Sequence, residues 1–167
     1  MKLDSLNKLY VDELKDLYSA ETQITKALPR MVKKATSPAL KAAFEAHLQQ
    51  TFGQIERLDR IFKTLENSPR GKKCVGMEGL LAEGKEMMGE DIEPEVLDAA
   101  LIAAAQKVEH YEISSYGTVR AYARLLGDNT AVDLLTLTLE EEVTTDEKLT
   151  LLAESGINVD AMETEPA

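Results

Sequence analysis

Carboxylic acids interrupt three apolar helical seams of this sequence, at positions where the spacing calls for interior side chains. One run of apolar residues spaced three and four apart extends from Leu14 to Met31, and Glu21 stands in its middle. Two later runs, over residues 101–126 and 132–153, are interrupted in the same way. The acids concerned are Glu21, then Glu112 with Glu109 one turn before it, and then Glu142 and Asp146. Because an unpaired buried carboxylate costs several kcal/mol, acids on three inward faces predict a shared counter-charge, most simply a metal ion.

Four long helices are expected to position these acids. The apolar periodicity predicts helices over about residues 5–34, 37–66, 93–126 and 128–155. Pro38 and Pro94 stand in first turns, where proline is favoured. Gly127 and Gly156 are expected to end the third and fourth helices. A short helix, broken by glycines, is expected within residues 75–88.

The connections predict an all-α, ferritin-like four-helix bundle. Short turns join the first helix to the second and the third to the fourth, so each pair forms an antiparallel hairpin. The connection between the hairpins has about 26 residues and can return along a helix of roughly 42 Å. Two hairpins with one long crossover are the ferritin-like topology. We expect residues 1–160 to form a single domain and residues 161–167 to be a frayed acidic tail.

The turns also fix the height of the acids along the bundle. Glu21 and Glu112 lie about 15 and 16 residues before their turns, and Glu142 lies about 14 residues after its turn, which places all three roughly 21–27 Å away. The acids should therefore form one layer near mid-bundle. Polar residues of the second helix face the same layer, namely His47, Gln50, Thr51 and Gln54.

A dinuclear metal centre is the chemistry that this layer favours. Four or five carboxylates cannot all ionise in a dry interior without cations, and two divalent ions would neutralise four charges. Carboxylate-rich sites with few nitrogen donors suit iron first, with manganese and zinc as alternatives. The candidate ligands are Glu21, Glu109, Glu112, Glu142, Gln54, His47 and Asp146.

Charge and composition exclude several classes of partner. The chain has 19 basic and 30 acidic residues and a net charge of −11, which argues against binding to nucleic acid or to an anionic membrane surface. Cys74 is the single cysteine, so no disulfide forms within the chain, and we expect it to be structural. With neither an apolar leader nor a membrane-length apolar run, we expect a soluble, cytoplasmic protein.

Several segments carry a resemblance to a known family. They are Tyr18-Ser19-Ala20-Glu21, His47-Leu48, Gly53-Gln54-Ile55-Glu56-Arg57, Cys74-Val75-Gly76-Met77-Glu78-Gly79-Leu80, Glu109-His110-Tyr111-Glu112-Ile113 and Leu139-Glu140-Glu141-Glu142. Over nearly its whole length the chain resembles the YciF/YciE bacterial stress-response proteins, and it is closer to the YciF side. The resemblance implies a ferritin-like bundle related in fold to rubrerythrin, a homodimer and a di-metal centre.

The ligand pattern departs from that of classical di-iron bundles, and two functions stay open. The chain has no Glu-x-x-His motif, so Gln54 and His47 are the candidates to complete the coordination of the metal ions. The first hypothesis is a stress-response oxidoreductase acting on O2 or peroxide, with catalytic residues unassigned. The alternative is a non-catalytic dimeric stress or assembly module with a structural or vestigial metal, in which the Met-containing crossover contributes to the dimer. Iron storage is disfavoured because no cage-forming element is evident.

Overall fold

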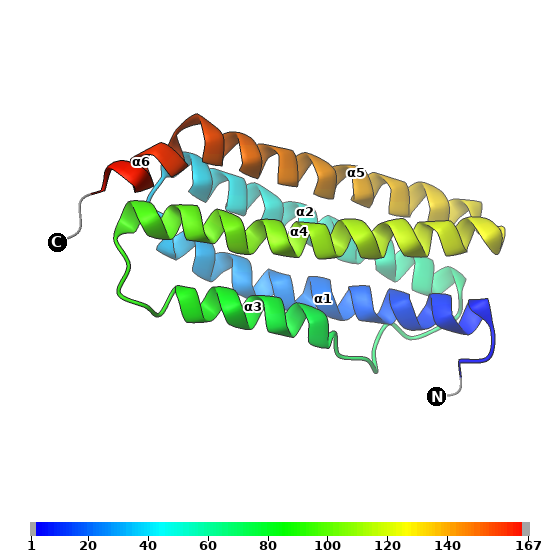
Figure 1. Ribbon diagram of the computed structural model, residues 1–167. Coiled ribbons are helices and arrows are strands. Elements are labelled where there is room, and N and C mark those ends of the chain that lie inside the picture. Colours follow the sequence, from blue (N-terminus) through cyan, green and yellow to red (C-terminus); the bar gives the residue numbers. More distant parts are fainter. Residues whose placement is uncertain (1–2, 165–167) are drawn as a thin grey trace.

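Four long helices lie side by side along the molecule (Figure 1). They are α1 (Leu6–Lys34), α2 (Pro38–Thr64), α4 (Pro94–Leu125) and α5 (Asn129–Leu152). The structure, a computed structural model, describes residues 3–164. Three of these helices begin with a side-chain cap, because the side chains of Ser5, Ser37 and Asp128 accept hydrogen bonds from the backbone N–H groups three residues ahead, at 3.3, 3.4 and 3.0 Å.

The helices form two antiparallel hairpins, α1–α2 and α4–α5, joined by a long crossover. This confirms the predicted all-α, ferritin-like topology. The crossover contains α3 (Val75–Met87), which packs against α1 and α4 and lies along their outer side in Figure 1. Within residues 3–164, no helix combines the length and apolar character needed to cross a membrane.

The Cys74 thiol fixes the beginning of α3. Its sulfur accepts a hydrogen bond from the Met77 backbone N–H at 3.3 Å and contacts the Tyr111 hydroxyl of α4 at 3.0 Å. Tyr111 in turn donates to Asp16 of α1 at 2.7 Å. Burial raises the pKa of the Cys74 thiol, which therefore stays protonated and links the crossover helix to the bundle.

The end of α5 differs from the prediction. Gly127 adopts a φ of 78° and ends α4 as expected. Gly156 instead lies inside a single π-helical segment, Ala153–Ile157, which continues into α6 (Asn158–Glu163). Because Ile157 is buried against the core, the chain keeps turning past the glycine. Residues 161–163, expected in the frayed tail, are therefore helical, and residues 165–167 lie outside the described part of the chain.

The buried interior consists of two apolar clusters, one toward each end of the bundle. The first cluster contains Ile24, Leu28, Phe44, Leu101 and Leu149 among others. The second cluster is built around Leu14, Leu58, Phe62, Val119 and Leu135. Between the two lies a layer of buried polar side chains, in the middle of all four long helices. The acids at apolar seam positions thus divide the core in two.

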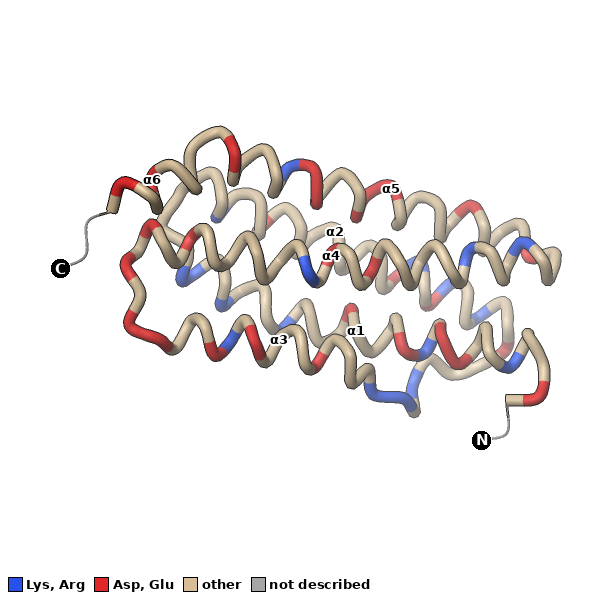
Figure 2. The backbone as a smooth tube through the Cα atoms, in the orientation of Figure 1, with Lys and Arg blue, Asp and Glu red and all other residues tan. Residues whose placement is uncertain are grey.

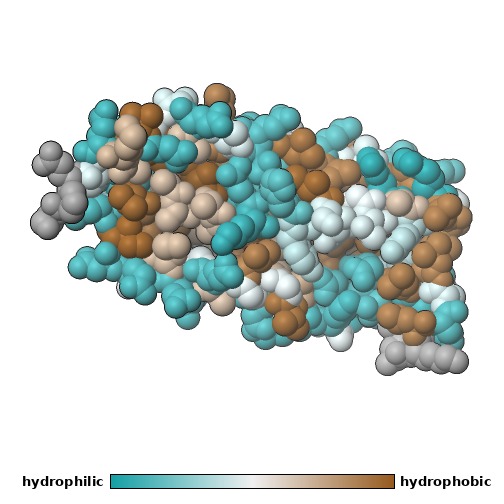
Figure 3. Space-filling model, in the orientation of Figure 1, coloured by the Kyte–Doolittle hydropathy of each residue, from teal (hydrophilic) through white to brown (hydrophobic). Residues whose placement is uncertain are grey.

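Charged and apolar side chains are unevenly distributed over the surface of the molecule. Acidic residues are distributed over all the long helices, and basic residues gather in the loop before α3 (Figure 2). On the face shown in Figure 3, apolar side chains gather near the end of the bundle where α4 begins.

Asp98 joins the two hairpins at one end. Its carboxylate is 3 % exposed and accepts hydrogen bonds from the Thr36 N–H at 2.8 Å, the Thr36 hydroxyl at 2.7 Å and the Ser37 N–H at 2.7 Å. These donors form the α1–α2 turn, whereas Asp98 belongs to the start of α4. The contact therefore sets the height of the first hairpin against the second, and with it the level at which Glu21 meets the acids of α4.

We expect Asp98→Asn to lower the free energy of unfolding by about 1–3 kcal/mol, because the new amide nitrogen must face a backbone N–H or hydroxyl donor. Glu95→Gln is the control, since Glu95 lies one turn earlier on α4 and is exposed. Urea unfolding followed by circular dichroism measures both variants. Equal effects of the two substitutions would contradict a linking role for Asp98.

Candidate metal centre

Four side chains from three helices converge in the polar layer. His47 of α2, Glu109 and Glu112 of α4, and Glu142 of α5 each offer one ligand atom, and these atoms all lie within 4.8 Å of one another. All four side chains are buried, at 4 % exposure or less. Glu109 and Glu112 share one helix face because they are three residues apart. The structure thus brings together four of the seven residues that the sequence suggested as ligands.

Glu21 and Gln54 are the fifth and sixth of those residues, and both border the group. Glu21 is fully buried, accepts a hydrogen bond from the Tyr116 hydroxyl through Oε1, and leaves Oε2 without a partner. Gln54 is also fully buried, and its Oε1 has no hydrogen-bond partner. Each therefore has one free oxygen in the layer.

Asp146, the seventh residue, lies outside the group. Its carboxylate is 19 % exposed and contacts Gln106 Nε2 at 3.1 Å and His110 Nε2 at 3.2 Å. Four residues advance a helix by about 400°, so Asp146 is rotated by about 40° from Glu142, toward the rim. Thr145 occupies the buried position of that turn instead. The heptad approximation could not resolve this rotation.

Unpartnered polar atoms are concentrated in this layer. In the described part of the chain, ten buried side-chain nitrogen or oxygen atoms have no hydrogen-bond partner, and all except Tyr10 Oη belong to the layer. They are Glu21 Oε2, His47 Nδ1 and Nε2, Gln54 Oε1, Glu109 Oε2, and both carboxylate oxygens of Glu112 and of Glu142. His47 Nε2 lies 3.2 Å from Glu109 Oε1, without hydrogen-bond geometry. Such a concentration of unpartnered oxygen and nitrogen atoms fits a bound cation.

Burial and mutual repulsion shift the protonation of the layer. The pKa values of Glu21, Glu109 and Glu112 are raised well above the usual value for glutamate. Burial is the largest cause, and the charges of neighbouring glutamates are the next largest. Burial raises the pKa of Glu142 to about 7. Burial also lowers the pKa of His47 to about 4, so its imidazole is neutral at neutral pH and its ring nitrogen can donate to a metal. The layer can hold protons or cations, but not four uncompensated negative charges.

An arginine–carboxylate pair holds Gln54 in place. Arg57 donates two hydrogen bonds to Glu141, at 2.6 and 2.7 Å, and one to Thr138 at 3.0 Å. Glu141 Oε2 also accepts from Gln54 Nε2 at 3.1 Å. Because the Gln54 amide nitrogen donates to Glu141, the amide oxygen Oε1 faces the layer without a hydrogen-bond partner.

The sequence did not identify these supporting residues. Glu141 stands in the run Glu140–Glu142, of which only Glu142 fits the apolar phase, and such runs are typical of solvated faces. The only signal was the presence of Arg57 and Glu141 in the segments that carry the family resemblance.

The metal-free protein should lose stability as the pH rises from about 5 to about 8. The folded-state pKa of Glu142, about 7, lies above its ordinary value of 4.5, so the folded state binds more protons across this interval. The free energy of unfolding then falls with pH, by up to about 1.4 kcal/mol per pH unit for each such group. Chemical unfolding in the presence of a chelator measures this slope.

Glu142→Gln should reduce that slope, because the amide does not titrate, whereas Glu140→Gln changes an exposed neighbour and should not. A metal-free protein that becomes more stable between these pH values would contradict the assignment.

Residues 5–162 match the family described as a domain of unknown function, DUF892. The Escherichia coli protein YciF is 47 % identical over 159 residues, covering 95 % of this chain and 96 % of that protein. The crystal structure of this E. coli stress protein matches with a TM-score of 0.90 at 46 % identity, over 93 % of this chain and 99 % of that one.

Two further structures agree with this match. YcfI from Rhodopseudomonas palustris has a TM-score of 0.86 at 45 % identity, over 90 % of this chain and 97 % of its own. A Xanthomonas campestris protein has a TM-score of 0.77 at 22 % identity, over 95 % of this chain and 97 % of its own, a likeness of fold. Sequence and structure together show that the chain is YciF-like and belongs to the DUF892 family.

Proposed function

We propose that the polar layer binds two divalent metal ions, iron in the first place, and that the protein is a redox metalloprotein that reacts with dioxygen or peroxide. The observation that supports the proposal is that nine buried polar atoms without a hydrogen-bond partner gather in this layer, on six residues of four helices. Four carboxyl groups in one dry layer require compensation, and two divalent ions supply four positive charges.

The donor set fits iron or manganese. Glu109, Glu112 and Glu142 offer carboxylate oxygens, and neutral His47 adds a nitrogen. Glu21 Oε2 and Gln54 Oε1 are free oxygens at the border of the group. Oxygen-rich sites with a histidine suit Fe or Mn, which also change oxidation state, whereas zinc does not. A bound iron or manganese pair would supply the redox couple.

The surrounding residues have roles of their own. Tyr116, fully buried, fixes Glu21 by its hydrogen bond. The raised pKa of Glu109 allows that carboxyl group to hold a proton when cations are absent. The apolar clusters on both sides keep bulk water away, which strengthens the electrostatic interactions inside the layer. Consumption of an oxidant would also suit a relative of the E. coli stress protein.

Metal loading tests the proposal directly. Protein purified without chelators should contain about two divalent ions per chain, measured by elemental analysis. Glu112→Gln should lose most of this metal, because both oxygens of Glu112 are free for coordination. Glu140→Gln, which changes an exposed acid of α5, should keep it. A wild-type protein that binds no iron, manganese or zinc at micromolar concentration would refute the proposal.

Oxygen consumption separates the redox function from a structural one. Anaerobically Fe(II)-loaded protein should consume O2 or peroxide on mixing, followed with an electrode and by the absorbance of Fe(III). Bound metal without any such reaction would favour the non-catalytic module.

Arg57→Lys should weaken metal binding by about 10–100-fold, because lysine cannot make the paired hydrogen bonds that hold Glu141 and, through it, Gln54. Arg60→Lys, at an exposed position of the same helix, is the control. Competition titration with a chromophoric chelator measures both affinities. Unchanged affinity in Arg57→Lys would exclude this positioning role.

A further inference from the structure

Three hollows adjoin one another between the candidate metal centre and the surface beside α3. The inner cavity, of about 20 Å³, lies between the long helices and has His47 and Glu109 in its wall. The outer cavity, also of about 20 Å³, lies beneath α3. A surface groove of about 290 Å³ runs between α1 and α3. Ala27 and Leu81 line all three, so the hollows meet at these two side chains.

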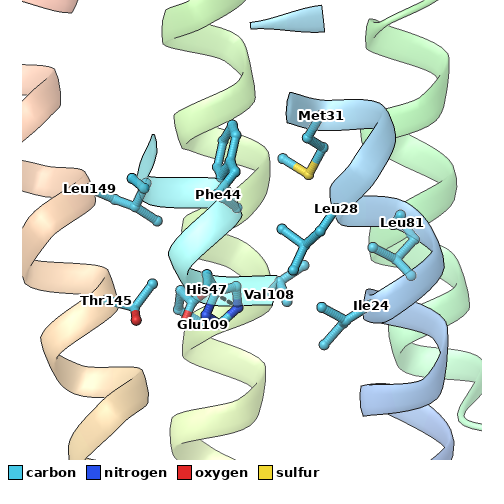
Figure 4. Close-up of a pocket in the computed structure, with 13 residues that line it drawn as sticks. Ile24, Leu28, Met31, Phe44, His47, Leu81, Val108, Glu109, Thr145 and Leu149 are labelled. Carbon is cyan, nitrogen blue, oxygen red and sulfur yellow. Dashed lines mark ion pairs between the residues drawn. The ribbon is translucent and has the colours of Figure 1, made fainter. Parts of the chain in front are cut away.

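The inner cavity is apolar except at the end that borders the candidate centre. Figure 4 shows Ile24, Leu28, Phe44 and Val108 turned toward a common space, with His47 beside Glu109 at one end. Leu81 of α3 approaches the same space from the opposite side of α1. The crossover helix thus contributes to the wall of the inner cavity.

We propose that the groove and the two cavities form an access path for dioxygen, which reaches the buried centre past Ala27 and Leu81. This inference rests on the proposed redox function and selects dioxygen over peroxide as its oxidant. It gives α3 a role beyond connecting the hairpins, since α3 supplies one side of the path.

The size of the cavities admits dioxygen, and the polarity of the outer cavity favours it over peroxide. A cavity holds one water-sized molecule when its volume reaches about 10–15 Å³, so each of the two cavities has room for one small molecule. An apolar cavity such as the outer one stays dry. Hydrogen peroxide would lose its hydrogen bonds to water in the outer cavity, whose lining side chains are all apolar, whereas dioxygen has none to lose.

The narrow points can open without a change of fold. Leu81 is only partly buried, and partly exposed side chains change rotamer rapidly. Ala27, also partly buried, faces Leu81 from α1 and leaves space because its side chain is a single methyl group.

Paramagnetic relaxation by dissolved dioxygen tests the path in metal-free protein. Methyl-labelled protein is compared by NMR under oxygen and under argon. The methyl groups of Ile24, Leu28 and Val108 should relax faster under oxygen than those of Leu14, Leu58 and Leu135. The latter three are also buried, at most 1 % exposed, but belong to the other apolar cluster. Equal enhancement in the two clusters would overturn the proposal.

Two substitutions act on the narrow points in opposite directions. Ala27→Leu should abolish the oxygen enhancement at Ile24 and Val108, and Leu81→Ala should increase it. Ala42→Leu, the same enlargement at an exposed site of α2 that lines none of the hollows, should leave it unchanged. If Ala27→Leu does not fold, Leu81→Ala still decides, because an unchanged or smaller enhancement overturns the proposal.

Metal-loaded protein then identifies the oxidant. Ala27→Leu should keep its metal content, and oxidation of its bound Fe(II) by dioxygen should be slower than in the wild type. Faster oxidation by peroxide than by dioxygen, unaffected by Ala27→Leu, would overturn dioxygen as the oxidant. Failure of the wild type to bind metal would refute the redox function but not the relaxation result, which requires no metal.

Discussion

Repulsion between carboxyl groups in a dry layer is the constraint on which the rest of this structure depends. The side chains of Glu21, Glu109, Glu112 and Glu142 are at most 1 % exposed. In the described part of the chain, no positively charged side chain lies within hydrogen-bond distance of these carboxyl groups. Burial and proximity raise their pKa values, so the layer must take up either protons or cations. The helices, the caps and the Asp98 link hold these four groups at one level against that repulsion.

The rigidity of helices explains why the sequence alone predicted most of this arrangement. A helix rises 1.5 Å per residue, so counting residues from each turn located Glu21, Glu112 and Glu142 in one layer. Caps at Ser5, Ser37 and Asp128 depend on local chemistry that a sequence displays directly. Local rules therefore sufficed for the helices and for the height of the acids.

Contacts between distant segments were beyond those rules. The Asp98 link to Thr36 and the pairing of Arg57 with Glu141 join residues about 60 and 84 positions apart. Asp146 lies at the rim of the layer because a turn of 3.6 residues drifts away from the heptad phase. The helix past Gly156 was missed because burial of Ile157, a tertiary effect, prevails over the local preference of glycine for helix ends.

The division of the interior into two apolar clusters has a further consequence. Side-chain packing stabilises each end of the bundle, but the middle depends on whatever neutralises the acids. Where divalent ions occupy the layer, their binding energy becomes part of the folding free energy. The lifetime of the folded chain in a cell then follows the supply of the ion, and starvation for that ion would expose the protein to proteolysis.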